Sequence, residues 1–144
     1  MPRTESKESL IELVIPNKPE FLRVVRLLVS GYVSRWPLSF DEVENVKVAV
    51  TEACNNAIQY AYDEGIERQL KIRCWNKKSK LFFEVSDKGR GMGLPDGDAL
   101  EPESVDDEMG LGFLLIRTLM DDVKVRTKPN HGTTVTMTKS LTIN

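Results

Sequence analysis

The sequence predicts one α+β domain over residues 1–144, a two-layer sandwich in which helices cover one face of a mixed, mostly antiparallel five-stranded sheet. Two patterns predict this class. Five short segments alternate apolar and polar residues, as half-buried strands do, and three longer segments repeat apolar residues every three or four positions, as amphipathic helices do. The length suits one domain, and 40% hydrophobic with 29% charged residues is typical of a globular chain.

The composition argues against several classes of protein. A net charge of −2 and a pI near 5.5 give no electrostatic reason to expect nucleic acid as a direct ligand. No apolar run approaches the roughly 18 residues of a membrane span, and the N-terminal segment lacks a signal-peptide stretch, so we expect no membrane contact and a cytoplasmic location. Cys54 and Cys74 lie in apolar patterns without metal-binding spacing, which predicts buried free thiols.

The first strand is predicted over residues 9–15, and Pro16 ends it. Asn17 followed by Glu20 is typical of a helix start, with Asn17 as the cap. This helix is expected to run to about Arg35. The residues expected to face the core are Ile11, Leu13 and Ile15 on the strand, and Phe21, Val24, Val25, Leu28 and Val29 on the helix.

The longest predicted helix begins at a second capping box, Ser39 with Glu42, and extends to about Tyr62. Because Glu52 and Asn56 are four residues apart on it, their side chains point the same way. They belong to a stripe of Ala49, Glu52, Asn56 and Gln59, which runs beside the apolar stripe of Val43, Val46, Val50, Ala53 and Ala57.

Two strands follow the long helix, with a turn at residues 76–79 between them. The first has its apolar residues at every second position: Leu70, Ile72 and Cys74. The second does the same with Leu81, Phe83 and Val85. Asp87 continues the second parity, so period-two geometry places its carboxylate at the end of the helix-covered face.

The segment from residue 89 to residue 109 shows no period, and between Leu94 and Met109 it contains seven acidic residues and no lysine or arginine. We interpret about residues 93–109 as a mobile lid with a function, since long loops in compact domains usually have one. A short helix is expected from Gly110 through Leu119. The last two strands are expected around Val123 and Val125 and over residues 133–137, with His131 in the turn between them.

Two glycine-rich segments suggest a nucleotide site. In the first, Asp87 can accept a hydrogen bond from an exocyclic amino group, while Gly89, Gly91 and Gly93 leave room for a base and ribose near the backbone. A glycine-rich turn with a capping aspartate is the alternative. In the second, residues 110–112 (Gly110, Leu111 and Gly112) open a helix whose free N–H groups suit an anion, although a flexible helix start explains them equally well. No P-loop pattern is present.

Three polar residues are expected to meet this site. The Asn56 amide oxygen, with phosphate oxygens and water, suits Mg²⁺, and Glu52 could deprotonate or orient an attacking hydroxyl. The alternative is that both are solvated surface residues. Thr133 shares the inward strand face, and its buried hydroxyl could serve an adenine edge directly or through water.

The order of these motifs resembles the Bergerat-fold ATPases, the superfamily of gyrase and the sensor histidine kinases. Within it the chain closely resembles the anti-sigma-factor serine kinases of the RsbW/SpoIIAB type, along residues 11–141. The strongest likeness lies in residues 41–62, 110–125 and 132–139.

The resemblance implies a role for each motif. Glu52 matches the catalytic glutamate and Asn56 the Mg²⁺-binding asparagine. Asp87 matches the adenine-reading aspartate, with Gly89 and Gly91 as its companions, and Thr133 the threonine at the adenine. Residues 110–112 match the loop near the phosphates of ATP or ADP.

The resemblance also implies partners. Such kinases are homodimers that hold a sigma factor inactive and phosphorylate a serine on a small STAS-type antagonist. Arg23 falls where the family uses an exposed arginine for partner contact. The cation-free lid departs from relatives that have a basic residue there, so charge neutralisation would depend on Mg²⁺, the amides of residues 110–112 and Arg90. A non-catalytic nucleotide-dependent binder therefore stays open as the alternative, and a free histidine-kinase ATPase domain is disfavoured because His131 is the only histidine.

Overall fold

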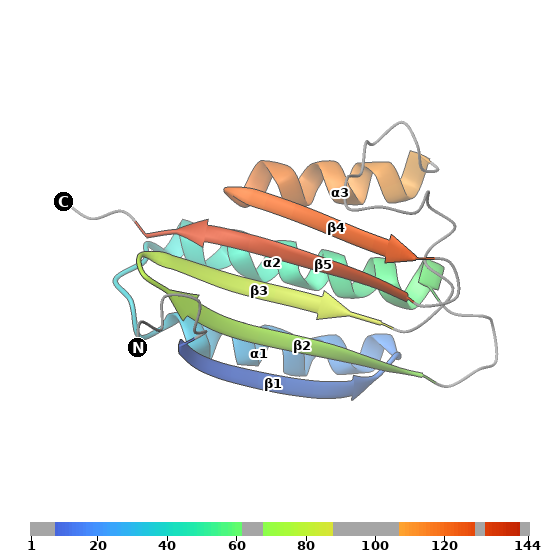
Figure 1. The fold of residues 1–144 in the computed structure, drawn as a ribbon, viewed down its shortest axis with the longest axis horizontal. Helices are drawn as coiled ribbons and strands as arrows, with labels where there is room; N and C mark the ends of the chain where they lie inside the picture. The colour runs from blue at the N-terminus through green and yellow to red at the C-terminus, as the bar shows by residue number, and fades with distance from the viewer. Residues whose placement is uncertain (1–7, 62–67, 88–106, 129–131, 142–144) are drawn as a thin grey trace, which may run out of the picture.

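The computed structural model describes residues 8–61, 68–87, 107–128 and 132–141 (Figure 1). Its strands are β1 (Glu8–Pro16), β2 (Gln69–Lys77), β3 (Lys80–Ser86), β4 (Asp122–Lys128) and β5 (Gly132–Ser140). Its helices are α1 (Leu22–Val33), α2 (Phe40–Asn56) and α3 (Asp107–Leu119), with a 3₁₀ turn at Pro19–Phe21 and a π-helical turn at Ala57–Ala61.

The five strands form one sheet in the order β1-β2-β3-β5-β4. All four neighbouring pairs are antiparallel, so the described sheet is purely antiparallel and not the mixed sheet that the sequence had predicted. Figure 1 shows the three helices on one face of this sheet, which confirms the predicted α+β sandwich. Among the described residues, no helix is long and apolar enough to cross a membrane.

The core lies between the sheet and the helices. The predicted stripe of α2 is buried at Val46, Val50, Ala53 and Ala57, and Val43 is partly buried against it. The strand parities are also confirmed, since Leu70, Ile72, Cys74, Leu81, Phe83 and Val85 are all buried. Cys54 and Cys74 are free and buried, as predicted, and burial raises the pKa of each thiol to about 12.

The start of the first helix differs from the prediction. Asn17 does not cap it: its side-chain oxygen accepts a hydrogen bond from the Arg68 N–H (3.0 Å), and its own N–H donates to the Arg68 carbonyl (2.9 Å). Asn17 therefore extends the contact between β1 and β2, and the helix begins with the 3₁₀ turn. Two residues predicted to face the core are exposed. Val24 lies on the outer flank of α1, and Ile11 lies on the edge strand β1.

The capping box of α2 is confirmed on both sides. The Glu42 N–H donates to the Ser39 hydroxyl oxygen (3.1 Å), and the Ser39 N–H donates to the Glu42 carboxylate (2.9 Å). Glu42 also pairs with Lys139 of β5 at 3.2 Å, which ties the start of α2 to the sheet. The hydrogen bond from the Ser39 N–H lowers the pKa of Glu42 most, and the contact with Lys139 lowers it further.

The third helix begins earlier than predicted. It starts at Asp107 rather than Gly110, so the last residues assigned to the lid, 107–109, belong to α3. The remainder of the predicted lid, residues 93–106, lies outside the described residues.

Candidate functional site

Five of the predicted site residues, Glu52, Asn56, Asp87, Gly112 and Thr133, belong to segments that meet at one end of the sandwich. The C-terminal ends of α2, β3 and β4 lie there, together with the starts of α3 and β5 (Figure 1). Antiparallel pairing produces this arrangement, because β3 and β4 both run towards the end at which β5 begins. Segments that are far apart in the chain can therefore contribute to one site.

Gly112 brings α3 against the polar residues of α2. A methyl group at Gly112 would lie 2.7 Å from Glu52 Oε2, 3.0 Å from Asn56 Nδ2 and 3.1 Å from Asn56 Oδ1. Real side chains almost never approach within 3.0 Å in this way. The two helices can adopt this packing because position 112 carries no side chain.

The anion site predicted at residues 110–112 needs correction. Because α3 starts at Asp107, Gly110 and Gly112 lie inside the helix and do not open it. The Gly112 N–H lies beyond the first four residues of α3, so it falls within the helical hydrogen-bond pattern rather than among the free groups of the first turn. Leu111 points outward and is 66% exposed. The observed contribution of this segment is close approach to Glu52 and Asn56.

Asn56 is a buried amide with an unused nitrogen. Its side chain is 2% exposed, and Nδ2 has no hydrogen-bond partner among the residues that the structure describes. Buried polar groups are usually paired, so an unpaired one requires an explanation. The α-helical pattern of α2 also ends at this residue and continues as the π-helical turn. Such turns occur frequently at functional sites.

Glu52 is partly buried one helical turn before Asn56. Burial raises the pKa of its carboxyl group above the ordinary value of 4.5. A carboxylate that holds its proton more tightly is a stronger base, which suits a group that accepts a proton from a hydroxyl. The alternative interpretation, that Glu52 and Asn56 are ordinary solvated residues, does not fit their burial.

Asp87 and Thr133 meet across neighbouring strands. The Asp87 N–H donates to the Thr133 carbonyl oxygen at 3.0 Å, and the two residues are only 5% and 2% exposed. The predicted placement of both on the helix-covered face is thereby confirmed. A buried carboxylate beside a buried hydroxyl offers an acceptor and a donor for the edge of a flat ligand.

The sequence reasoning missed Thr127 of β4. Its Oγ1 lies 3.0 Å from Thr133 Oγ1, and its side chain is 7% exposed. The alternation along β4 could have predicted it, because Thr127 lies two residues after Val125 and four after Val123, on the same face of the strand.

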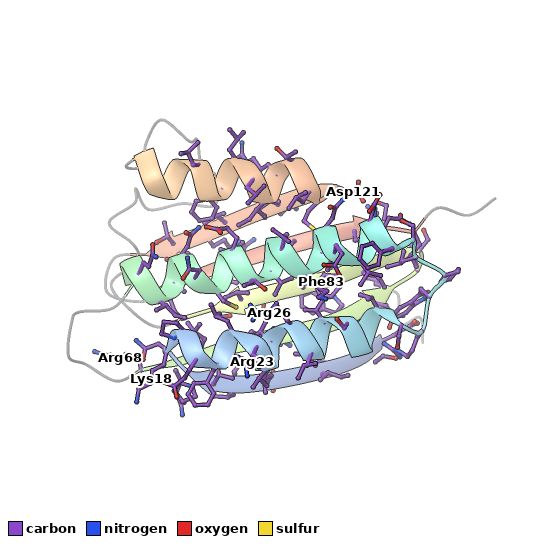
Figure 2. All side chains as sticks on the ribbon, turned by 180° about the vertical axis from the view of Figure 1, so that it is seen from behind. Lys18, Arg23, Arg26, Arg68, Phe83 and Asp121 are labelled. Carbon is purple, nitrogen blue, oxygen red and sulfur yellow. The ribbon has the colours of Figure 1, made fainter. Side chains whose placement is uncertain are left out.

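Several predicted site residues fall elsewhere. Gly89, Gly91, Gly93 and Arg90 lie outside the described residues, as does His131. Arg23 is exposed on α1, and Figure 2 shows it with Arg26 along this helix. It belongs to a surface apart from Glu52 and Gly112.

The residues present fit a magnesium nucleotide. The described residues contain no group of three histidine, cysteine, aspartate or glutamate side chains that could hold a metal ion by themselves. A single amide oxygen at Asn56, completed by phosphate oxygens and water, is the kind of ligand set that Mg²⁺ accepts. The unpaired Asn56 nitrogen can donate to a phosphate oxygen.

Comparison with known proteins is consistent with this geometry. Residues 15–139 match the family of the histidine kinase-like ATPase domain. The serine-protein kinase RsbW of Bacillus subtilis is 40% identical over 91% of this chain and 85% of its own length. That of Bacillus velezensis is 39% identical over 91% and 85%, and that of Staphylococcus aureus 36% identical over 94% and 89%.

A solved structure shows the same fold. The crystal structure of the RsbU and RsbW domains of a Mycobacterium tuberculosis protein aligns with a TM-score of 0.70 at 14% identity. The alignment covers 94% of this chain and 33% of that longer one. The chain therefore belongs to the histidine kinase-like ATPase family and, within it, to the nucleotide-binding serine-protein kinases of the RsbW type.

Proposed function

We propose that the chain is an ATP-dependent serine-protein kinase and anti-sigma factor in a partner-switching circuit. It phosphorylates a serine on a small STAS-type antagonist protein, and the phosphorylation state of the antagonist decides whether the kinase holds the antagonist or a sigma factor. It acts as a homodimer in the cytoplasm. The names of its relatives, serine-protein kinase RsbW, support the kinase part of this proposal.

The observation that carries the proposal is the contact of Gly112 with Glu52 and Asn56. It joins a partly buried base and an unpaired buried amide in one place. A protein that only bound nucleotide would have no chemical need for a base at this position.

Each residue has a role in the proposed reaction. Glu52 accepts the proton of the serine hydroxyl and orients that oxygen towards the terminal phosphate. Asn56 holds Mg²⁺, which when bound neutralises charge on the phosphates. Phosphoryl transfer depends mostly on such positioning and charge neutralisation.

The base of the nucleotide lies against the other half of the site. The Asp87 carboxylate accepts from the adenine amino group, and Gly89, Gly91 and Gly93 leave space for the base and ribose. Thr133 contacts the same edge of the base. Gly110, Leu111 and Gly112 lie on the phosphate side. The close spacing of Asp87 and Thr133 supports this assignment.

Incubation with labelled ATP, Mg²⁺ and a candidate antagonist tests the proposal. We expect label on the antagonist with the wild-type chain and none with Glu52→Ala, whose binding of ADP is retained because the carboxylate acts in transfer. An antagonist whose acceptor serine is replaced by alanine is the control. Undiminished transfer by Glu52→Ala would refute the role of Glu52.

A second candidate is a nucleotide-dependent binder without catalysis. The absence of lysine and arginine between residues 94 and 109 favours it, because less positive charge is then available for the terminal phosphate. Binding of ATP and antagonist by the wild-type chain, without transfer of label, is the result expected from this candidate.

The partner surface is proposed at the outer side of α1. Arg23 and Arg26 are exposed there, and the neighbouring apolar residues Val24 and Leu27 are 41% and 68% exposed. Figure 2 shows Lys18 and Arg68 near the N-terminal end of α1. Positive and apolar side chains together suit a partner with an acidic, partly apolar surface.

A further inference from the structure

Thr127 and Thr133 form a pair of buried hydroxyls at the nucleotide end of the sheet. They are direct partners in the register of β4 and β5, so both side chains project from the same face. Their Oγ1 atoms are 3.0 Å apart, and the side chains are 7% and 2% exposed. A hydrogen bond therefore joins the two residues away from bulk solvent.

The backbone connects this pair to Asp87. The Asp87 N–H donates to the Thr133 carbonyl at 3.0 Å, so the carboxylate of Asp87, the hydroxyl of Thr133 and the hydroxyl of Thr127 come from three adjacent strands. Main-chain pairing sets the spacing between these strands at just under 5 Å. The row of polar groups is therefore held by the sheet itself.

The direction of the hydrogen bond between the threonines decides what Thr133 can offer to a ligand. A hydroxyl carries one hydrogen and two lone pairs. If Thr133 donates to Thr127, its only hydrogen is used and it can only accept from a ligand. If Thr127 donates to Thr133, the Thr133 hydrogen is available to an acceptor on the ligand, directly or through one water.

We propose that Thr127 is a positioning residue that donates to Thr133 and thereby makes Thr133 a hydrogen-bond donor towards the base. An ionised Asp87 can only accept, so the two residues together present an acceptor and a donor. This pattern complements adenine, which has an amino group beside an unprotonated ring nitrogen. It opposes guanine, which has a carbonyl oxygen beside a ring N–H. The inference rests on the proposed function, in which adenine lies against Asp87 and Thr133.

Substitutions at Thr127 test the inference through nucleotide selectivity. Thr127→Val keeps the shape of the side chain and removes the hydroxyl, whereas Thr127→Ser keeps the hydroxyl. We expect Thr127→Val to weaken ADP binding about threefold to tenfold, because the Thr133 hydroxyl, no longer held by Thr127, can rotate and lose its hydrogen bond to the base. GDP affinity should change less, so that the preference for ADP over GDP falls. Thr127→Ser should stay within about twofold of the wild type.

Calorimetric titration with Mg²⁺ and each nucleotide measures these affinities. Thr138→Val is the matched control, because Thr138 is another buried threonine, 6% exposed, on β5 but at the opposite end from Thr133. We expect it to leave both affinities unchanged. Thermal melting of each variant separates loss of fold from loss of selectivity. If Thr127→Val does not melt cooperatively, Thr127→Ala compared with Thr127→Ser serves the same purpose.

A double-mutant cycle shows whether Thr127 acts through Thr133. In a Thr133→Val background the second change, Thr127→Val, should have no further effect on the preference for ADP. Additive effects would overturn the inference, as would equal losses of ADP and GDP or an unchanged preference in Thr127→Val. A wild-type chain that binds no ADP would instead contradict the proposed function.

Discussion

Gly112 lies where a side chain would collide with Glu52 and Asn56 of α2. The nearest of these atoms, Glu52 Oε2, is the end of a side chain that can rotate away, whereas Asn56 is buried and less free to move. A larger residue at position 112 would therefore displace the site more readily than it would unfold the protein. This separates the effect on activity from the effect on stability.

We expect Gly112→Ala to lower the rate of serine phosphorylation about ten- to hundredfold, because small displacements of a base or metal ligand are costly. Its stability should stay within about 1 kcal/mol of the wild type, since alanine improves helix propensity while the contact is strained. Gly31→Ala is the control, because a methyl group there meets nothing within 4 Å. It should keep full activity and melt at the same or a higher temperature. Unchanged activity of Gly112→Ala would contradict the proposed contact.

Glu52→Gln is expected to stabilise the fold at neutral pH. Burial raises the pKa of Glu52 above 4.5, so the folded protein binds this proton more tightly than the unfolded chain does. Ionisation therefore costs the fold stability as pH rises from about 4.5 through the raised pKa. The melting temperature of Glu52→Gln should exceed that of the wild type at pH 7–8, and the difference should vanish below pH 4.5.

Thermal melting across this pH range measures the effect, with the exposed acid Glu20 replaced by glutamine as the control. Equal melting temperatures of Glu52→Gln and the wild type at pH 8 would show that burial does not raise the pKa of the Glu52 carboxyl group. The same shift also predicts that the acid limb of the kinase pH profile lies above 4.5, since the base must be ionised to act.

At the scale of elements, α2 is the part that positions the site. Its start is held by the capping box and by the pair between Glu42 and Lys139, while its end carries Glu52 and Asn56. Its buried stripe fixes its rotation over β3 and β5. The polar stripe borders the buried one, and its residues Glu52 and Asn56 lie against Gly112 of α3.

Ser39→Ala removes the side-chain acceptor at the start of α2. We expect a loss of about 1 kcal/mol in the free energy of unfolding, the usual value for an N-cap serine. Denaturant titration measures the change. Ser34→Ala is the comparison. The Ser34 hydroxyl donates to the Gly31 carbonyl at the C-terminal end of α1, so it caps no N–H group. A loss at Ser34 as large as that at Ser39 would show that the capping box is not the cause.

At the scale of the whole molecule, the proposed nucleotide joins segments from residue 52 to residue 133. A ligand that binds the folded chain alone stabilises it by mass action, by about 2.7 kcal/mol at 100 times its dissociation constant. For a chain of this size we expect a rise in melting temperature of roughly 5–10 °C with Mg²⁺ and ATP. The rise should be smaller without Mg²⁺ and largely absent in Asp87→Asn. Equal shifts in Asp87→Asn and the wild type would remove Asp87 from the site.

The partner surface on α1 gives a prediction at the same scale. Arg23→Ala should weaken binding of an antagonist or sigma factor about tenfold, a loss typical of an arginine central to an interface. Surface plasmon resonance with the purified partner measures it. Lys124→Ala, an exposed cation on β4, is the matched control and should have no effect. A larger effect at Lys124 than at Arg23 would place the partner elsewhere.

From the sequence alone, the order of the helices and strands and most of the faces that they bury could be predicted. Alternation placed Asp87 and Thr133 on the inward face, and the spacing of Glu52 and Asn56 placed them on one side of α2; the structure confirms these positions. Such patterns are local, because each depends on the period of one helix or strand. The role of Asn17 was predicted wrongly, since its partner, Arg68, is 51 residues away.

How these residues meet depends on the packing of the folded chain and could not be predicted from local patterns. The contact of Gly112 with Glu52 and Asn56 depends on the distance between two helices, and the hydrogen bond of Thr127 with Thr133 depends on the register of two strands. Because α3 starts earlier than predicted, Gly112 lies inside the helix, where it closely approaches Glu52 and Asn56. Distances between elements arise from the packing of the whole core, to which residues far apart in the chain contribute together.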